Sequence, residues 1–186
     1  MSEQDIPESN FPSRPDSSSD EWPRIWASEI ESYEPDVIIV LVGGWDTTER
    51  IFPDWGERPR TIGDEIYDDW LISEYEAALE LLTSHDARVV WLTAPCLAVR
   101  NDGMGVWDPA RTVRHNQILR HFEKMRGADL ELLDLNSKVC PSGEFTNELA
   151  GMERIRPDGA HFSNEAEDWL AEWLAGHILE SDRSGI

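Results

Sequence analysis

Residues 35–50, PDVIIVLVGGWDTTER, contain the stretch that decides the fold. Pro35 ends a preceding helical pattern, and the apolar run at residues 37–42 then has the length of a strand. A strand that is apolar at every position is typical of a parallel sheet covered on both faces. Gly43 and Gly44 end the run. We therefore expect a fully buried strand whose carboxyl end leads into residues 43–46.

Outward from this strand, helical and strand patterns alternate along the chain. Helices are predicted at residues 21–33, 64–85, 108–126 and about 164–179, and further strands at 87–95 and 129–136. Asp108 and Pro109 have the residue types of a helix start, and Asn164 is expected to cap the last helix. This alternation predicts an α/β fold with a parallel sheet, in which ligands bind beyond the carboxyl ends of the strands.

The composition limits the partners and the domain organisation. The formal net charge of −22 repels nucleic-acid phosphates and anionic membranes, so neither is expected as a partner. No apolar run approaches the roughly 18–20 residues of a membrane span, and the N-terminus lacks the pattern of a signal peptide. We expect a disordered or extended segment at residues 1–20, one α/β domain at 21–180 and a flexible tail at 181–186.

A candidate acid–base pair stands just before the last predicted helix. Asp158 lies three residues before His161, and this spacing lets the carboxylate reach the ring Nδ1 and leave Nε2 for a nucleophile. The alternative is a helix start that contains a histidine by chance. The remaining histidines, His85, His115, His121 and His177, are expected at the surface or at helix boundaries. No cofactor or metal site is predicted.

Two cysteines, Cys96 and Cys140, each follow a predicted strand. If those strands are neighbours, the thiols can approach the distance of a disulfide. The alternative is two unrelated cysteines, buried or free. Neither belongs to a CxxC pair, so a zinc site is not expected.

The last block, RPDGAHFSNEAEDWLAEWL at residues 156–174, resembles the final block of the SGNH hydrolases, the GDSL-type esterases. More narrowly, the chain resembles the extracytoplasmic SGNH domain fused to type-3 membrane acyltransferases, over about residues 22–179. The segments that carry this resemblance are PDVIIVLVGGWDTTER (35–50), IGDEIYDDWL (62–71), ARVVWLTAPC (87–96), VRHNQILRHF (113–122), LLDLNSKVCPSG (132–143) and DGAHFS (158–163).

The resemblance implies a flavodoxin-like, three-layer parallel sheet and the hydrolysis or transfer of a small acyl group, usually on a surface glycan. It assigns Asp158 and His161 as the catalytic acid and base. It also implies an extracytoplasmic location, although the chain itself shows no export signal, so the sequence leaves the localisation open.

Two departures from the family pattern matter. Where the family commonly has G-x-N-D, with an Asn that donates to the oxyanion, this chain has Gly43-Gly44-Trp45-Asp46. The glycines can still bring backbone N–H groups close, and Trp45 either stacks on a sugar or packs against the core. We therefore expect residues 43–46 to form an oxyanion or substrate-binding segment.

The second departure is the nucleophile, because no Gly-Asp-Ser occurs in the chain. The nearest string is Gly63-Asp64-Glu65, and Ser142 and Ser163 are unorthodox alternatives in loops beside the predicted site. The family's sheet order is 2-1-3-4-5, and this chain is expected to hold only the last three strands and to lack the first strand and its serine.

Lacking those strands, the strand at residues 37–42 should have an open edge that pairs with a second copy or with a missing segment. The competing function is a catalytically inactive SGNH-like module that binds a glycan or a partner.

Overall fold

The computed structural model describes residues 21–56, 58–100 and 107–184. Its centre is a parallel sheet of order β1-β2-β3, formed by β1 (Val37–Leu41), β2 (Arg88–Leu92) and β3 (Glu131–Leu133). In the register, Ile39 of β1 lies opposite Val90, and Trp91 lies opposite Leu132. The parallel sheet confirms the α/β class predicted from the alternating pattern. Residues 1–20, expected to be disordered or extended, lie outside the described part of the chain.

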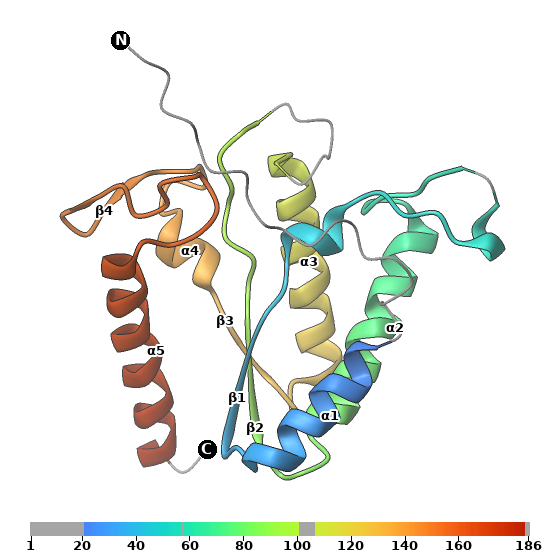
Figure 1. Ribbon diagram of the computed structural model, residues 1–186, viewed down its shortest axis with the longest axis horizontal. Helices are drawn as coiled ribbons and strands as arrows, with labels where there is room; N and C mark the ends of the chain where they lie inside the picture. The colour runs from blue at the N-terminus through green and yellow to red at the C-terminus, as the bar shows by residue number, and fades with distance from the viewer. Residues whose placement is uncertain (1–20, 57, 101–106, 185–186) are drawn as a thin grey trace.

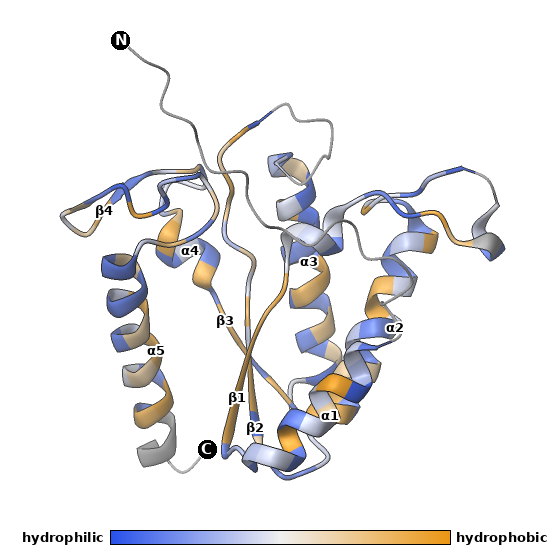
Figure 2. Cartoon of the chain, viewed as in Figure 1, coloured by the Kyte–Doolittle hydropathy of each residue, from blue (hydrophilic) through white to orange (hydrophobic). Residues whose placement is uncertain are grey.

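Helices cover both faces of the sheet (Figure 1). On one face α1 (Trp22–Tyr33), α2 (Glu65–Leu82) and α3 (Pro109–Arg126) pack around a core that contains Trp91, Tyr75 and Phe122. On the other face lie α4 (Leu135–Val139) and α5 (Asn164–Ser184). Figure 2 shows hydrophobic residues along β1 and on the helix sides that face the sheet.

Two helix starts follow directly from local chemistry. The carboxylate of Asp64 accepts a hydrogen bond from the N–H of Ile66 at 3.1 Å, and that of Asp108 accepts from Ala110 at 2.9 Å. Each satisfies a backbone donor that the first turn of a helix leaves without a partner. Pro109 stands at the first helical position, where its missing N–H costs nothing.

The alternating pattern missed four shorter elements. These are the 3₁₀ helices η2 (Gly44–Thr47) and η3 (Pro53–Trp55), together with β4 (Glu148–Leu149) and β5 (Met152–Glu153), which pair as an antiparallel hairpin. The pattern also missed α4, which begins at Leu135 inside the segment expected to be strand. Elements this short span too few residues for a period to show.

Strand β1 is not fully buried, contrary to the expectation from its apolar run. Ile39 is 43% exposed and Leu41 is 48% exposed. The cluster on this face joins α5 to β2 and β3, through residues such as Val90 and Leu133, and reaches only Val37 of β1. Because β1 lies at the edge of the sheet, beyond the cover of α5, its outer residues on this face stay open to solvent.

The expectation for His115 was also wrong. Its side chain is completely buried, with the hydroxyl of Tyr75 at 2.6 Å from its Nε2. His115 lies four residues before Leu119 and seven before Phe122 on α3, and all three are buried. It therefore belongs to the inward face of the helix.

The ends of α5 differ from the prediction as well. Ser163, not Asn164, caps its start, since the Ser163 Oγ accepts from the N–H of Ala166 at 3.4 Å. The helix continues to Ser184, so residues 181–184, expected in a flexible tail, are helical. No glycine or proline follows Gly176 until Gly185, so nothing in the sequence stops the helix earlier.

Candidate active site

Asp158 and His161 form a hydrogen-bonded pair in the loop before α5. The Oδ2 of Asp158 lies 2.6 Å from the Nδ1 of His161, and its Oδ1 accepts the N–H groups of Ala160 at 2.9 Å and of His161 at 2.8 Å. With its proton on Nδ1, the neutral ring donates to the carboxylate, and Nε2 becomes its basic position. The loop is therefore built to fix both the tautomer and the orientation of His161.

The electrostatics of the pair follow from these contacts. Partial burial alone would raise the pKa of Asp158, but the hydrogen bonds from His161 and from the N–H of Ala160 outweigh it and lower the pKa to about 2. Asp158 is therefore ionised at neutral pH. The side chain of His161 is 67% exposed. A carboxylate that holds an exposed imidazole can stabilise the imidazolium formed when the ring takes up a proton.

Arg156 links this loop to neighbouring segments through hydrogen bonds of its side chain. The sequence did not indicate this structural role. It is fully buried, donates to the carbonyl oxygens of Cys96, Thr146 and Val139, and stacks 4.5 Å from the centroid of the Phe145 ring. Burial lowers its pKa to about 10, so the guanidinium remains charged at neutral pH. A charged Arg in a loop has no periodic signal that would have marked it as buried.

Cys96 and Cys140 form a disulfide between the segment after β2 and the end of α4. The bond lies directly against Arg156, whose Nη2 is 3.6 Å from the Sγ of Cys96 and 3.8 Å from the Sγ of Cys140. Of the two arrangements that the sequence left open, the structure has the disulfide.

The segment after β2 also contacts the loop of the pair directly. The N–H of Ala98 donates to the carbonyl oxygen of Gly159 at 2.9 Å. Gly159 has φ +87°, and a Cβ at this position would lie 2.5 Å from the Cβ of Ala98. Only glycine can adopt this backbone conformation without strain and leave room for the side chain of Ala98.

Asn116 fixes the start of the same segment. Its side chain accepts from the N–H of Ala94 at 2.8 Å and donates to the carbonyl oxygen of Ala94 at 2.9 Å. Asn136 donates to that oxygen as well, at 2.9 Å. Asn116 thus holds the start of the loop after β2.

Residues 43–46 follow β1 at the carboxyl edge of the sheet. Gly43 lies close to the segment after β2, since a Cβ there would be 3.0 Å from the Cβ of Ala94. Trp45 is 60% exposed, so its ring does not pack into the core. The segment therefore presents an open aromatic ring near the end of the sheet.

Asp46 turns in a different direction, into a cavity of about 260 Å³ that Trp22, Trp26 and Trp70 also line. Burial raises its pKa to about 6, against the lowering effect of Arg50, and the negative charge of Glu74 raises it further. The structure thus places Trp45 and Asp46 on different sides of this segment.

The candidate serines do not resemble activated nucleophiles. The hydroxyl of Ser163 serves as the cap of α5, and Ser142 is exposed in the turn after Cys140. Gly63-Asp64-Glu65, the nearest string to Gly-Asp-Ser, is the start of α2. The described residues bring together no group of three or more His, Cys, Asp or Glu that could hold a metal ion. Within the described residues, no helix is both long and apolar enough to cross a membrane.

A comparison with protein families identifies the family of the chain. Residues 13–177 match a family described as a protein of unknown function, DUF459. The chain belongs to the DUF459 family. DUF459 is associated with SGNH-like hydrolases, and its match includes Gly43, Trp45, Asp158 and His161. No curated protein matches the chain.

Proposed function

We propose that this chain is an SGNH-type domain that supplies the acid–base pair of a serine esterase or O-acyltransferase acting on small acyl esters, such as those of a cell-surface glycan. The observation that carries the proposal is the 2.6 Å contact between Asp158 and the Nδ1 of an exposed His161. Membership of DUF459 and the resemblance of residues 156–174 to the last SGNH block support it.

In this proposal His161 acts as a general base and then as a general acid. Its Nε2 takes the proton of an attacking serine hydroxyl, the oxygen bonds to the acyl carbon, and the imidazolium returns the proton to the leaving alkoxide. Water or a second hydroxyl then removes the acyl group by the same proton route. Asp158 remains ionised and holds the ring, in keeping with its low pKa. In this proposal the attacking serine comes from a segment outside the described residues.

The second candidate is an SGNH-like module that binds a glycan without catalysis. Two observations favour it: Ser163 caps a helix, and the exposed ring of Trp45 offers a surface on which a sugar can stack.

The test compares His161→Ala and Asp158→Asn with the matched control His177→Ala. His177 also contacts a carboxylate, with its Nε2 2.8 Å from Glu131. Hydrolysis of p-nitrophenyl acetate should fall by about 10²-fold or more in His161→Ala, fall in Asp158→Asn and remain unchanged in His177→Ala.

Labelling with a fluorophosphonate then locates the attacking group. An adduct on one serine, lost in His161→Ala, supports the esterase and identifies its nucleophile within the chain. Hydrolysis that depends on His161 without an adduct supports the acid–base pair with a nucleophile from elsewhere. Neither hydrolysis nor adduct on folded protein contradicts the proposal and favours the binding module.

A further inference from the structure

We propose that the cavity between α1, α2 and the segment after β1 is a binding site for a small organic ammonium ion of the quaternary amine type. The lining of the cavity comes from α1, α2, Trp91 of β2 and residues 42–50, and it includes neither Asp158 nor His161. The inference therefore goes beyond the proposed esterase function and does not depend on it.

Aromatic side chains form much of the wall of this cavity. Four tryptophans and one tyrosine line it, namely Trp22, Trp26, Trp70, Trp91 and Tyr75. The rings of Trp22 and Trp26 meet edge to face, with their centroids 4.9 Å apart. Aromatic rings attract ammonium cations through the negative potential of their faces, and sites for quaternary amines are commonly built from several such rings. The volume of about 260 Å³ lies below the roughly 300–1,000 Å³ of sites for drug-sized ligands, so the cavity suits a small ion.

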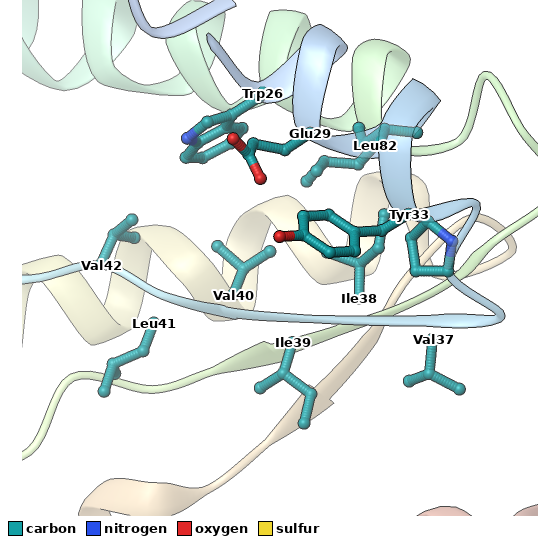
Figure 3. A pocket seen from close by; sticks show the side chains of 12 residues that line it. Trp26, Glu29, Tyr33, Val37, Ile38, Ile39, Val40, Leu41, Val42 and Leu82 are labelled. Carbon is teal, nitrogen blue, oxygen red and sulfur yellow. The ribbon is translucent and has the colours of Figure 1, made fainter.

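The cavity lies in the part of the fold where ligands are expected. Trp26 and Val42 line both this cavity and the neighbouring hollow of about 470 Å³ between α1 and β1. Figure 3 shows these two side chains at the end of the hollow that lies toward the carboxyl end of β1. Ligands of α/β folds bind beyond the carboxyl ends of the strands.

Three charged side chains also line the cavity, and their charges do not balance. They are Asp46, Glu74 and Arg50. The Nη2 of Arg50 donates to the carbonyl oxygen of Trp45 at 3.4 Å, and its guanidinium carbon lies 4.9 Å from the centroid of the Trp70 ring. Within the described residues, neither carboxylate forms a hydrogen bond or an ion pair. With both carboxylates ionised, one bound cation would bring the sum of the three charges and its own to zero.

The protonation of Asp46 reflects this imbalance. Burial raises the pKa of its carboxyl to about 6, Arg50 lowers it, and the negative charge of Glu74 raises it further. The other titratable groups beside it, the hydroxyls of Tyr67 and Tyr75, have pKa values that burial raises above 10, so both are neutral at neutral pH. A cation in the cavity would favour the ionised form of Asp46, and the ionised form would favour the cation by the same factor. Binding should therefore strengthen as the pH rises through about 6.

Charge distinguishes the cation from other small ligands of the same size. A neutral sugar can also stack on tryptophan rings, but it would leave the negative charge of Asp46 and Glu74 without compensation. An anion would add to that charge. The combination of tryptophan rings with two unpaired carboxylates therefore favours an ammonium ion.

The test measures the binding of choline to the full chain by isothermal titration calorimetry, at pH 8 and pH 5 and at constant ionic strength. The matched ligand is 3,3-dimethyl-1-butanol, in which a carbon atom replaces the ammonium nitrogen, so that the shape is kept and the charge is removed. On the protein, Asp46→Asn and Glu74→Gln each remove one negative charge with little change in shape. Glu76→Gln is the matched control, because Glu76 is exposed on α2 and does not line the cavity.

We expect choline to bind at pH 8 and to bind about tenfold more weakly at pH 5, where only about a tenth of the Asp46 carboxyls are ionised. The neutral alcohol should bind at least about tenfold more weakly than choline at pH 8. Asp46→Asn should weaken the binding of choline and remove most of its pH dependence. Glu74→Gln should also weaken it, and Glu76→Gln should bind choline like the wild type.

Three results would overturn the proposal. The first is equal binding of choline and the neutral alcohol, which would show that the cavity selects shape and not charge. The second is unchanged binding of choline in Asp46→Asn, and the third is no binding of choline to the wild type at pH 8. Circular dichroism checks that each variant is folded, and the comparison of the two ligands uses the wild type alone, so it does not depend on any variant.

Discussion

The buried imidazole of His115 should make the stability of the protein depend on pH in a way that one substitution removes. The ring lies in the core on α3, with the Tyr75 hydroxyl oxygen 2.6 Å from its Nε2. Burial lowers the pKa of His115 from 6.5 to about 4.

The direction of this pH dependence follows from whether the folded or the unfolded state binds the proton at the higher pH. Above pH 6.5 the ring is neutral in both states, and the contribution to stability is fully present. Below it the unfolded chain takes up the proton while the folded protein does not, so stability falls until the pH passes the folded-state pKa of about 4. The full loss is about 3 kcal/mol, of which about 2 kcal/mol is reached at pH 5.

The measurement is urea unfolding at pH 8 and pH 5 of the wild type, His115→Gln and His121→Gln. A glutamine amide can still hydrogen-bond the Tyr75 hydroxyl, and His121 is an exposed histidine on the same helix. Between the two pH values His115→Gln should lose about 2 kcal/mol less than the wild type, whereas His121→Gln should match the wild type. An identical loss in all three proteins would refute the reasoning.

Three further predictions concern stability. Replacing Cys96 and Cys140 together by alanine should lower the free energy of unfolding by about 4 kcal/mol, because the bond spans a sequence separation of 44; an unchanged urea midpoint would count against this. Gly159→Ala should cost about 2–4 kcal/mol, since the added Cβ meets Ala98 with φ at +87°, and wild-type thermal unfolding would show that the loop is not held there. Asp46→Asn should add about 1–2 kcal/mol at pH 8 and little at pH 4, because the carboxyl, whose pKa burial raises to about 6, is protonated in the native state only at the lower pH; an equal gain at both pH values would contradict that cause.

The large elements were predictable because their signals are local. The apolar run at residues 37–42 and the turn chemistry of Asp108 and Pro109 indicate a strand and a helix start without any knowledge of the rest of the chain. The pair Asp158 and His161 was also visible, since a carboxylate three residues before a histidine reaches it within one turn. Each of these features depends on residues close together in the sequence.

What the sequence did not indicate depends on contacts across the chain. The burial of Arg156 requires the carbonyl oxygens of Cys96 and Thr146, which are far from it in the sequence. The exposure of Leu41 depends on how far α5 extends over the sheet. His115 is different, because its spacing from Leu119 could have placed it on the buried face of α3.

The disulfide links the geometry of the candidate site to the chemistry of its surroundings. Disulfides persist where conditions are oxidising, whereas in most cytosols thiol reductants keep cysteines in the reduced form. The bond between Cys96 and Cys140 lies against Arg156, and the segment that contains Cys96 holds Gly159 beside the pair of Asp158 and His161. Reduction would leave Arg156 and the bond from Ala98 to hold that loop. Among these three restraints on the loop of Asp158 and His161, the disulfide is the one that forms by oxidation after the chain is made.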